Sequence, residues 1–265
     1  MQPIRDQTFA ISPQNESDLG FYCYIPSTWD GQRWIVSIHG YTRNAAAHIT
    51  QLAKEAAFRQ CAVVAPIFPR AVFGAFQTLS PSKEGVLPED AFERCVARAQ
   101  LLLGVGDEPA VLGYSGGGQF LHRYLMMREG ACRRAVLFAP GWYTSPDADV
   151  PYPCGTGSSQ RLLARTPNIE NLASVPTTVL VGTNDVCRDG TLNTDPKITE
   201  LQGPTRVERA QRWVDAMNEA LGVDAITLRV LSGIGHDFSS NVKRRGLAKI
   251  LFDELLMQTS EKNNA

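Results

Sequence analysis

Residues 113–117 have the sequence Gly-Tyr-Ser-Gly-Gly, which places a serine among small residues at the spacing G-x-S-x-G. This spacing is typical of a sharp turn between a strand and a helix, where only small neighbours leave room for a strained serine backbone. The turn lifts the hydroxyl out of the sheet at the positive end of the following helix. We therefore expect Ser115 to be a nucleophile that attacks a carbonyl carbon.

Two other interpretations of this glycine-rich segment are a turn with an exposed serine and a loop that cradles phosphate. The phosphate loop is disfavoured because the chain lacks G-x-x-x-x-G-K-[ST], and residues 116–118 do not follow the order G-x-G-x-x-G. A short strand is expected at 110–113 and an apolar helix at 119–128, which is the setting that a nucleophilic serine requires.

A serine hydroxyl is a weak nucleophile and needs a nearby base. The chain has four histidines. His48 lies in an alanine-rich helical pattern and His122 lies about two turns into the helix after the serine, so both are expected to be structural or surface residues. His39 ends a strand. His236 stands in a glycine-rich loop after the last expected strand, where catalytic groups of a parallel sheet collect. His236 is therefore the predicted base.

The acid that supports the base should follow a strand between the nucleophile and the base. Asp185 comes directly after the expected strand 177–181. Its carboxylate would accept a hydrogen bond from the far side of the imidazole and stabilise the imidazolium. A turn-capping role would also suit its Gly-Thr-Asn-Asp setting. Asp189 and Asp195, further along the same loop, are the alternatives. Asp237 adjoins the base, but neighbouring residues in an extended loop point apart.

Acyl transfer also requires backbone N–H donors for the developing oxyanion. One donor is expected at Gly116, immediately after the serine, and the other at Tyr41, in the loop that follows His39-Gly40. The substrate pocket should form around these loops.

Four residues are predicted to bind the substrate. Gly40 and Tyr114 adjoin the oxyanion donor and the nucleophile, while Trp142 and Tyr143 follow a strand end on the catalytic side. The two aromatic residues could equally be core residues.

The elements that must position these residues alternate between short β-branched runs and helical patterns, which indicates an α/β fold with a mainly parallel sheet. Antiparallel edge strands are expected at the N-terminus and helices on both faces. The expected strands are 8–12, 20–25, 33–38, 62–67, 110–113, 134–138, 177–181 and 226–231, and the expected helices are 44–59, 89–103, 119–128, 207–221 and 242–256.

No linker or repeat divides the chain, so residues 1–265 are expected to form a single domain. Residues 141–175 are rich in Pro, Gly, Ser and Asn and interrupt the alternation of strands and helices. A structureless loop of this length is unusual, so we expect a small lid or binding excursion. The second long connection, 186–205, has a similar composition.

Hydrophobic residues make up 43% of the chain and charged residues 20%, with a formal net charge of −1. This balance is typical of a globular protein and argues against a nucleic acid partner or an anionic membrane surface. The basic run 243–245 is expected on a solvated helix face. No stretch is apolar enough to span a membrane, and no signal peptide is visible, so a cytoplasmic location is expected if Met1 is the natural start.

The six cysteines show no CxxC spacing and no pairing with histidine, which argues against a zinc site. Most lie in apolar surroundings and are expected in the core. Cys154 and Cys187 lie in loop-like sequence and could pair in an oxidising compartment. The proposed chemistry needs no metal or organic cofactor.

Taken together, His39-Gly40, residues 113–117, Asp185 and His236 resemble the α/β-hydrolase superfamily over nearly the whole chain. The order serine, acid, histidine is the order of that superfamily. Residues 202–210, Gln-Gly-Pro-Thr-Arg-Val-Glu-Arg-Ala, are similar to a poly(3-hydroxybutyrate) depolymerase-like or feruloyl-esterase-like branch. The resemblance implies an α/β-hydrolase fold and a serine hydrolase acting on a small-molecule ester.

The sequence thus favours an enzyme that cleaves a carboxylic ester of a small or medium-sized substrate through an acyl-enzyme on Ser115. A thioesterase or a peptidase could use the same three residues. The other alternative is a non-catalytic α/β-hydrolase scaffold that binds a small molecule or a partner protein. An intact serine, histidine and aspartate in the right order argue against this scaffold.

Overall fold

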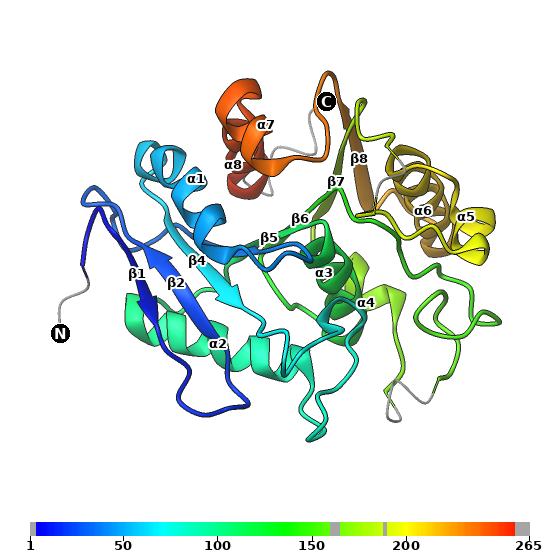
Figure 1. Ribbon diagram of the computed structural model, residues 1–265, viewed down its shortest axis with the longest axis horizontal. Helices are drawn as coiled ribbons and strands as arrows, with labels where there is room; N and C mark the ends of the chain where they lie inside the picture. The colour runs from blue at the N-terminus through cyan, green and yellow to red at the C-terminus, as the bar shows by residue number, and fades with distance from the viewer. Residues whose placement is uncertain (1–3, 160–164, 188–189, 258–265) are drawn as a thin grey trace.

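A computed structural model describes residues 4–159, 165–187 and 190–257, and the chain folds around one eight-stranded sheet (Figure 1). The strand order is β1-β2-β4-β3-β5-β6-β7-β8. β1 and β2 pair antiparallel at one edge, and all pairs from β4 to β8 are parallel. The strands are β1 (Thr8–Ile11), β2 (Gly20–Tyr24), β3 (Trp34–Ile38), β4 (Ala62–Ile67), β5 (Ala110–Tyr114), β6 (Arg134–Phe138), β7 (Thr177–Gly182) and β8 (Ile226–Leu231).

Helices cover both faces of this sheet (Figure 1). One face is covered by α1 (Ala45–Phe58), α7 (Phe238–Arg245) and α8 (Leu247–Leu256). The other is covered by α2 (Pro88–Leu103), α3 (Gly116–Met127), α4 (Ile169–Ala173) and α6 (Arg206–Leu221). A short 3₁₀ helix, η1 (Phe76–Thr78), contacts α3, and α5 (Pro196–Gln202) contacts α6.

The strands form because both of their faces are buried. Along β5, Val111 packs into the core on the α3 side, whereas Ala110 and Leu112 pack into the core on the α8 side. Successive side chains point to opposite faces of a strand, so a strand covered on both faces is a continuous apolar run. Because the strands β3 to β8 run parallel to one another, they all end at one edge of the sheet, where the loops that follow them meet.

The predicted α/β architecture is confirmed, and most elements lie within one or two residues of the expected bounds. The prediction of one closing helix over 242–256 is wrong, because this range contains the end of α7 and the whole of α8. Gly246 has φ 67°, a left-handed conformation that ends α7 and turns the chain into α8. The basic run 243–245 consequently forms the last turn of α7, where positive charge is favourable.

The long connections hold more helix than the sequence predicts. α4 lies within 141–175 and α5 lies within 186–205. Of the described residues in 141–175, Trp142 lines the pocket described below. The lid or binding role of this segment stays a prediction.

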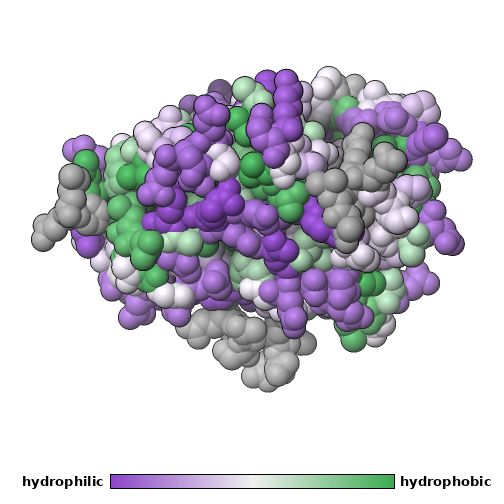
Figure 2. Space-filling model, turned by 90° about the horizontal axis from the view of Figure 1, so that it is seen from below, coloured by the Kyte–Doolittle hydropathy of each residue, from purple (hydrophilic) through white to green (hydrophobic). Residues whose placement is uncertain are grey.

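Hydrophilic residues dominate the face seen in Figure 2, and hydrophobic residues form separate groups among them. Within the ranges described, no helix has the length and apolar character needed to cross a membrane. The structure places no disulfide bond between Cys154 and Cys187, the pair considered from the sequence.

Candidate active site

Ser115 lies between the end of β5 and the first residue of α3, as the motif predicts. Its backbone has φ 51° and ψ −109°, a conformation that costs free energy for any residue with a Cβ. The surrounding chain holds this conformation: the Ser115 N–H donates to the Phe138 carbonyl at 2.8 Å, and the Gln119 N–H donates to the Ser115 carbonyl at 3.0 Å. The strained turn presents the hydroxyl at the N-terminus of α3.

The glycines around Ser115 are required by close backbone contacts. A methyl group on Gly117 would lie 2.3 Å from the Ile38 carbonyl oxygen. A methyl group on Gly113 would lie 2.5 Å from the carbonyl oxygen of Gly117. Both distances are shorter than van der Waals contact, so α3 can lie this close to β3 and β5 only without side chains there.

The structure brings His236 and Asp185 together from different loops. Asp185 follows β7 and is 1% exposed, and His236 follows β8. The Nδ1 atom of His236 and the Oδ2 atom of Asp185 are 2.9 Å apart. Because the carboxylate accepts, Nδ1 carries the proton of this hydrogen bond and Nε2 is left for the opposite side of the ring.

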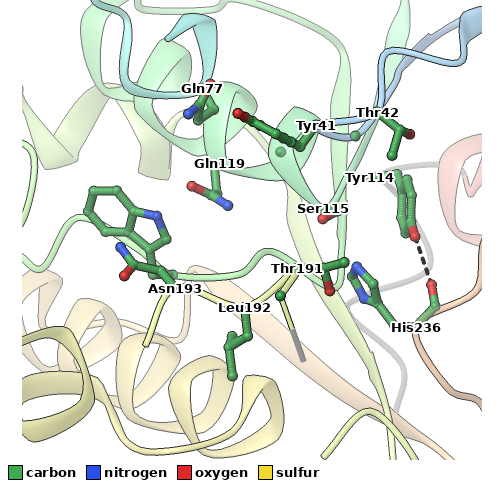
Figure 3. Close-up of a pocket in the computed structure, with 14 residues that line it drawn as sticks. Tyr41, Thr42, Gln77, Tyr114, Ser115, Gln119, Thr191, Leu192, Asn193 and His236 are labelled. Atoms are coloured by element: carbon green, nitrogen blue, oxygen red, sulfur yellow. Dashed lines mark hydrogen bonds between the residues drawn. The ribbon is translucent and has the colours of Figure 1, made fainter. Parts of the chain in front are cut away.

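The loop that carries His236 is fixed on both sides of this residue. The Tyr114 hydroxyl donates to the His236 carbonyl at 2.8 Å (Figure 3). Asp237 caps the N-terminus of α7 by accepting from the Ser240 N–H. Tyr114 is also the residue before Ser115, so one side chain joins the turn at Ser115 to the loop of His236.

The other candidate carboxylates have different roles in the structure. Asp195 caps α5 by accepting from the Lys197 N–H at 2.8 Å. Asp237 is the cap of α7. Asp189 lies outside the described residues. Among the described carboxylates of these loops, Asp185 is the one that contacts the imidazole of His236.

Sequence reasoning gave no role to Arg206, the first residue of α6. Its side chain is 0% exposed, and Nη1 donates to Asp185 Oδ1 at 2.9 Å. Nη2 donates to the Thr191 hydroxyl at 2.8 Å. Asp185 is therefore held between a guanidinium on one oxygen and an imidazole on the other. Arg206 belongs to the segment 202–210 that carries the resemblance, but a lone arginine at a helix start gives no signal of this contact.

The three remaining histidines are buried rather than exposed. His39 and His122 each use both ring nitrogens, one toward the carbonyl of Gly40 or Gly118 and the other accepting from the N–H of Phe68 or Thr144. Burial lowers the pKa of His39 to about 4 and lowers the pKa of His122 well below its usual value. Both rings are thus neutral and structural.

His48 is equally structural. Its ring stacks on Phe238 with centroids 4.3 Å apart, and its Nδ1 lies 3.0 Å from the Ser37 hydroxyl. Burial lowers the pKa of His48 to about 3. Through this stack, α1 supports α7, the helix that begins directly after the loop of His236.

The peptide between Gly40 and Tyr41 has a fixed orientation. Its carbonyl oxygen lies 2.9 Å from His39 Nδ1 and accepts from the Arg43 N–H at 3.0 Å. Because a trans peptide directs its C=O and N–H oppositely, the Tyr41 N–H points away from these partners. A methyl group on Gly116 would lie 3.0 Å from the Tyr41 nitrogen, so the two expected donors are neighbours.

Ser115 and His236 line the same pocket, which has a volume of about 370 Å³ (Figure 3). Gly40, Tyr114 and Trp142, three of the residues predicted to bind substrate, line this pocket. The expectation for Tyr143 is wrong, because its side chain is 0% exposed and stacks on Trp213 with centroids 4.6 Å apart. The other lining residues, including several that the sequence did not predict, are Tyr41, Thr42, Gln77, Gly116, Gln119, Gly190, Thr191, Leu192 and Asn193.

These lining residues give the pocket a mixed polar and apolar wall. Gln77 lies in η1, Gln119 lies in the first turn of α3, and Asn193 lies in the loop before α5. The described lining residues include no aspartate, glutamate, lysine or arginine. Within the described ranges, no three histidine, cysteine, aspartate or glutamate side chains gather closely enough to hold a metal ion.

Comparison with solved structures finds the same fold in several hydrolases. The chain is similar to a poly(3-hydroxybutyrate) depolymerase from Bordetella parapertussis, with a TM-score of 0.79 and 23% identity over 96% of this chain and 93% of that one. It is also similar to poly(aspartic acid) hydrolase-1 from Sphingomonas sp. KT-1, with a TM-score of 0.77 and 23% identity over 93% and 98%.

A more distant neighbour is an S-formylglutathione hydrolase from Agrobacterium tumefaciens, with a TM-score of 0.61 and 15% identity over 94% and 95% of the two chains. No protein-family model matches the chain, and no curated protein sequence does so significantly. The structural likeness confirms the predicted α/β-hydrolase fold.

Proposed function

We propose that this protein is a serine hydrolase that cleaves a carboxylic ester of a small or medium-sized substrate. The observation that carries the proposal is the hydrogen-bonded pair of Asp185 and His236 at the wall of a pocket that also contains Ser115. The pocket volume of about 370 Å³ falls in the range of small-molecule sites. The named hydrolases among the structural neighbours support the same reaction class.

In this mechanism the Ser115 hydroxyl attacks the ester carbonyl while His236 Nε2 takes its proton. The carbonyl oxygen becomes an oxyanion that the N–H groups of Gly116 and Tyr41 stabilise. The tetrahedral intermediate collapses as the imidazolium returns the proton to the leaving alcohol. An acyl-enzyme on Ser115 remains.

Water then enters and His236 removes a proton from it, so that a hydroxide equivalent adds to the acyl carbon. Collapse of the second tetrahedral intermediate breaks the bond to Ser115 Oγ, which recovers its proton from the imidazolium. The carboxylic acid leaves. Asp185 keeps the Nδ1 proton in place and stabilises the imidazolium in both halves of the cycle.

Replacement of the nucleophile tests the proposal. A fluorophosphonate probe should label the wild-type protein at one site, and Ser115→Ala should lose both the label and turnover of p-nitrophenyl esters by at least about 1000-fold. Ser12→Ala, on the exposed N-terminal edge, is the matched control and should keep both. Near-full turnover by Ser115→Ala would refute the mechanism.

The same assay separates the alternatives. A folded wild-type protein that neither reacts with the probe nor turns over an ester, a thioester or an amide would be the non-catalytic scaffold. A protein that prefers a thioester or an amide over p-nitrophenyl esters of the same acyl chain would be a thioesterase or a peptidase with the same three residues. We expect the oxygen esters to be turned over.

A further inference from the structure

A guanidinium lies buried behind one wall of the pocket. Arg123, in the second turn of α3, is 0% exposed. Among the described residues, no carboxylate lies within 4.0 Å of its nitrogens, and its Nη2 has no hydrogen-bond partner. Buried charges are normally paired, because an unpaired charge in the interior costs several kcal/mol. An unpaired buried cation beside a pocket therefore calls for an explanation.

The Nε atom of Arg123 donates to the buried Thr144 hydroxyl at 2.9 Å, and its other contacts attach it to the pocket wall. Its Nη1 donates to the carbonyl oxygens of Gln77 at 2.8 Å and Gln119 at 3.0 Å. Its guanidinium carbon lies 4.2 Å from the centre of the Trp142 ring. All three of these neighbours line the pocket. The positive charge is thus separated from the pocket by a single layer of residues.

Arg123 keeps its positive charge at neutral pH, and the described residues of the pocket wall carry no negative charge to offset it. Burial lowers the pKa of Arg123 to about 10, so the side chain remains protonated at neutral pH. No aspartate or glutamate is among the described lining residues. A low-dielectric wall transmits the field of a buried charge better than water does, so the adjacent part of the pocket has a positive potential.

The position of this region relative to His236 indicates which part of the ester it receives. Figure 3 shows Gln77 and Gln119 on the side of Ser115 away from His236. The leaving alcohol must lie beside His236, because the imidazolium gives it a proton. The acyl chain therefore extends toward Gln77 and Gln119.

We propose that the preferred substrate is an ester whose acyl chain carries an anionic group, such as a half-ester of a dicarboxylic acid, held by the field of Arg123. This inference rests on the proposed function, since it specifies the substrate of the same site. A purely structural role for Arg123, in which it joins α3 to the carbonyls of neighbouring loops, is the competing explanation. The two differ in how activity depends on the charge of the substrate.

Three p-nitrophenyl esters of matched length provide the test: the monoanionic adipate, the neutral heptanoate and the cationic 5-(trimethylammonio)pentanoate. The wild-type protein should have a larger kcat/KM for the adipate than for the cationic ester by about 300-fold. This is the ratio for reversing a unit charge roughly 10 Å from the guanidinium at an effective dielectric constant of about 20. A preference for the cationic ester, or none, overturns the proposal without any variant.

Arg123→Met removes the charge, whereas Arg123→Lys keeps it and loses the planar fork. We expect the adipate-to-heptanoate ratio of kcat/KM to fall about tenfold in Arg123→Met and to stay within about threefold of wild type in Arg123→Lys. Arg134→Met, at a buried arginine that begins β6 outside the pocket, is the control and should leave the ratio unchanged.

A structural role would lower kcat/KM for all three esters in parallel, and that result would overturn the proposal. Failure of the proposed function has a different signature. In that case no ester is hydrolysed, and Ser115 is not labelled by the fluorophosphonate. Activity on esters without discrimination by charge would retain the hydrolase and reject the role of Arg123.

Discussion

Replacement of Arg206 by methionine, a neutral side chain of similar length, tests the contact that holds Asp185, the proposed acid of the site. Arg206 and Asp185 are both buried, and the guanidinium donates to Asp185 Oδ1 at 2.9 Å. Removing one partner of a buried ion pair typically costs about 3–5 kcal/mol of folding free energy. Because Asp185 keeps its hydrogen bond to His236, we expect the lower end, a loss of about 3 kcal/mol.

The same change should also slow the proposed reaction. Asp185 accepts from Arg206 through Oδ1 and from His236 through Oδ2. Without the guanidinium, Oδ1 loses its buried partner, and the carboxylate is held less firmly against the imidazole. Because the proposed mechanism needs Asp185 to orient His236, we expect kcat to fall on the order of tenfold.

The measurements are urea unfolding and the kcat and KM for a p-nitrophenyl ester. Arg209→Met is the matched control, since Arg209 is buried on the same helix and donates to the carbonyls of Gly203 and Gly141 rather than to Asp185. It should lower stability and change kcat less than Arg206→Met does. An unchanged kcat in Arg206→Met would refute the claim that the guanidinium positions Asp185, and unchanged stability would refute the claim that the pair stabilises the fold.

Two further predictions concern the scaffold around the site. Gly117→Ala places a methyl group 2.3 Å from the Ile38 carbonyl and should lower the free energy of unfolding by at least about 3 kcal/mol, measured by urea unfolding, whereas Gly106→Ala, with nothing within 4 Å, should change it by less than about 0.5 kcal/mol. Because burial lowers the pKa of His39 to about 4 and of His48 to about 3, both rings oppose protonation in the folded state. The free energy of unfolding should therefore be highest above about pH 6.5 and should fall toward pH 4, by about 3 kcal/mol for His39 alone. In His39→Gln the free energy of unfolding should fall less over this pH range. An equal fall in the variant would contradict the prediction.

The strand-to-helix turn at Ser115 could be predicted from the sequence because its steric requirements are local. Steric demands at Ser115 are met by residues within three positions of it, and those residues are visible as a motif. The positions predicted for His236 and Asp185 follow from a more general rule, since parallel strands end at one edge of the sheet and their loops meet there. The structure brings these two side chains into contact.

The remaining parts of the site depend on contacts that no local pattern encodes. Trp142 and Tyr143 are neighbours of the same chemical type, yet one lines the pocket and the other packs on Trp213, because adjacent residues of an extended segment point in opposite directions. The pocket role of Gln119 was not predicted because a glutamine in the first turn of a helix is also typical of a solvated face. The contact between Arg206 and Asp185 joins residues 21 positions apart.

Arg206 donates hydrogen bonds to both Asp185 and Thr191, and this affects any redesign of the pocket. Thr191 lines the pocket, so it is an obvious position to randomise in a directed-evolution library. The Thr191 hydroxyl also accepts a hydrogen bond from Arg206 Nη2. The other terminal nitrogen of Arg206, Nη1, donates to Asp185, which contacts His236. If the proposed mechanism holds, substitutions at Thr191 will therefore couple to the reaction step, and we expect variants selected for a new substrate to lose rate unless Arg206 Nη2 finds another acceptor.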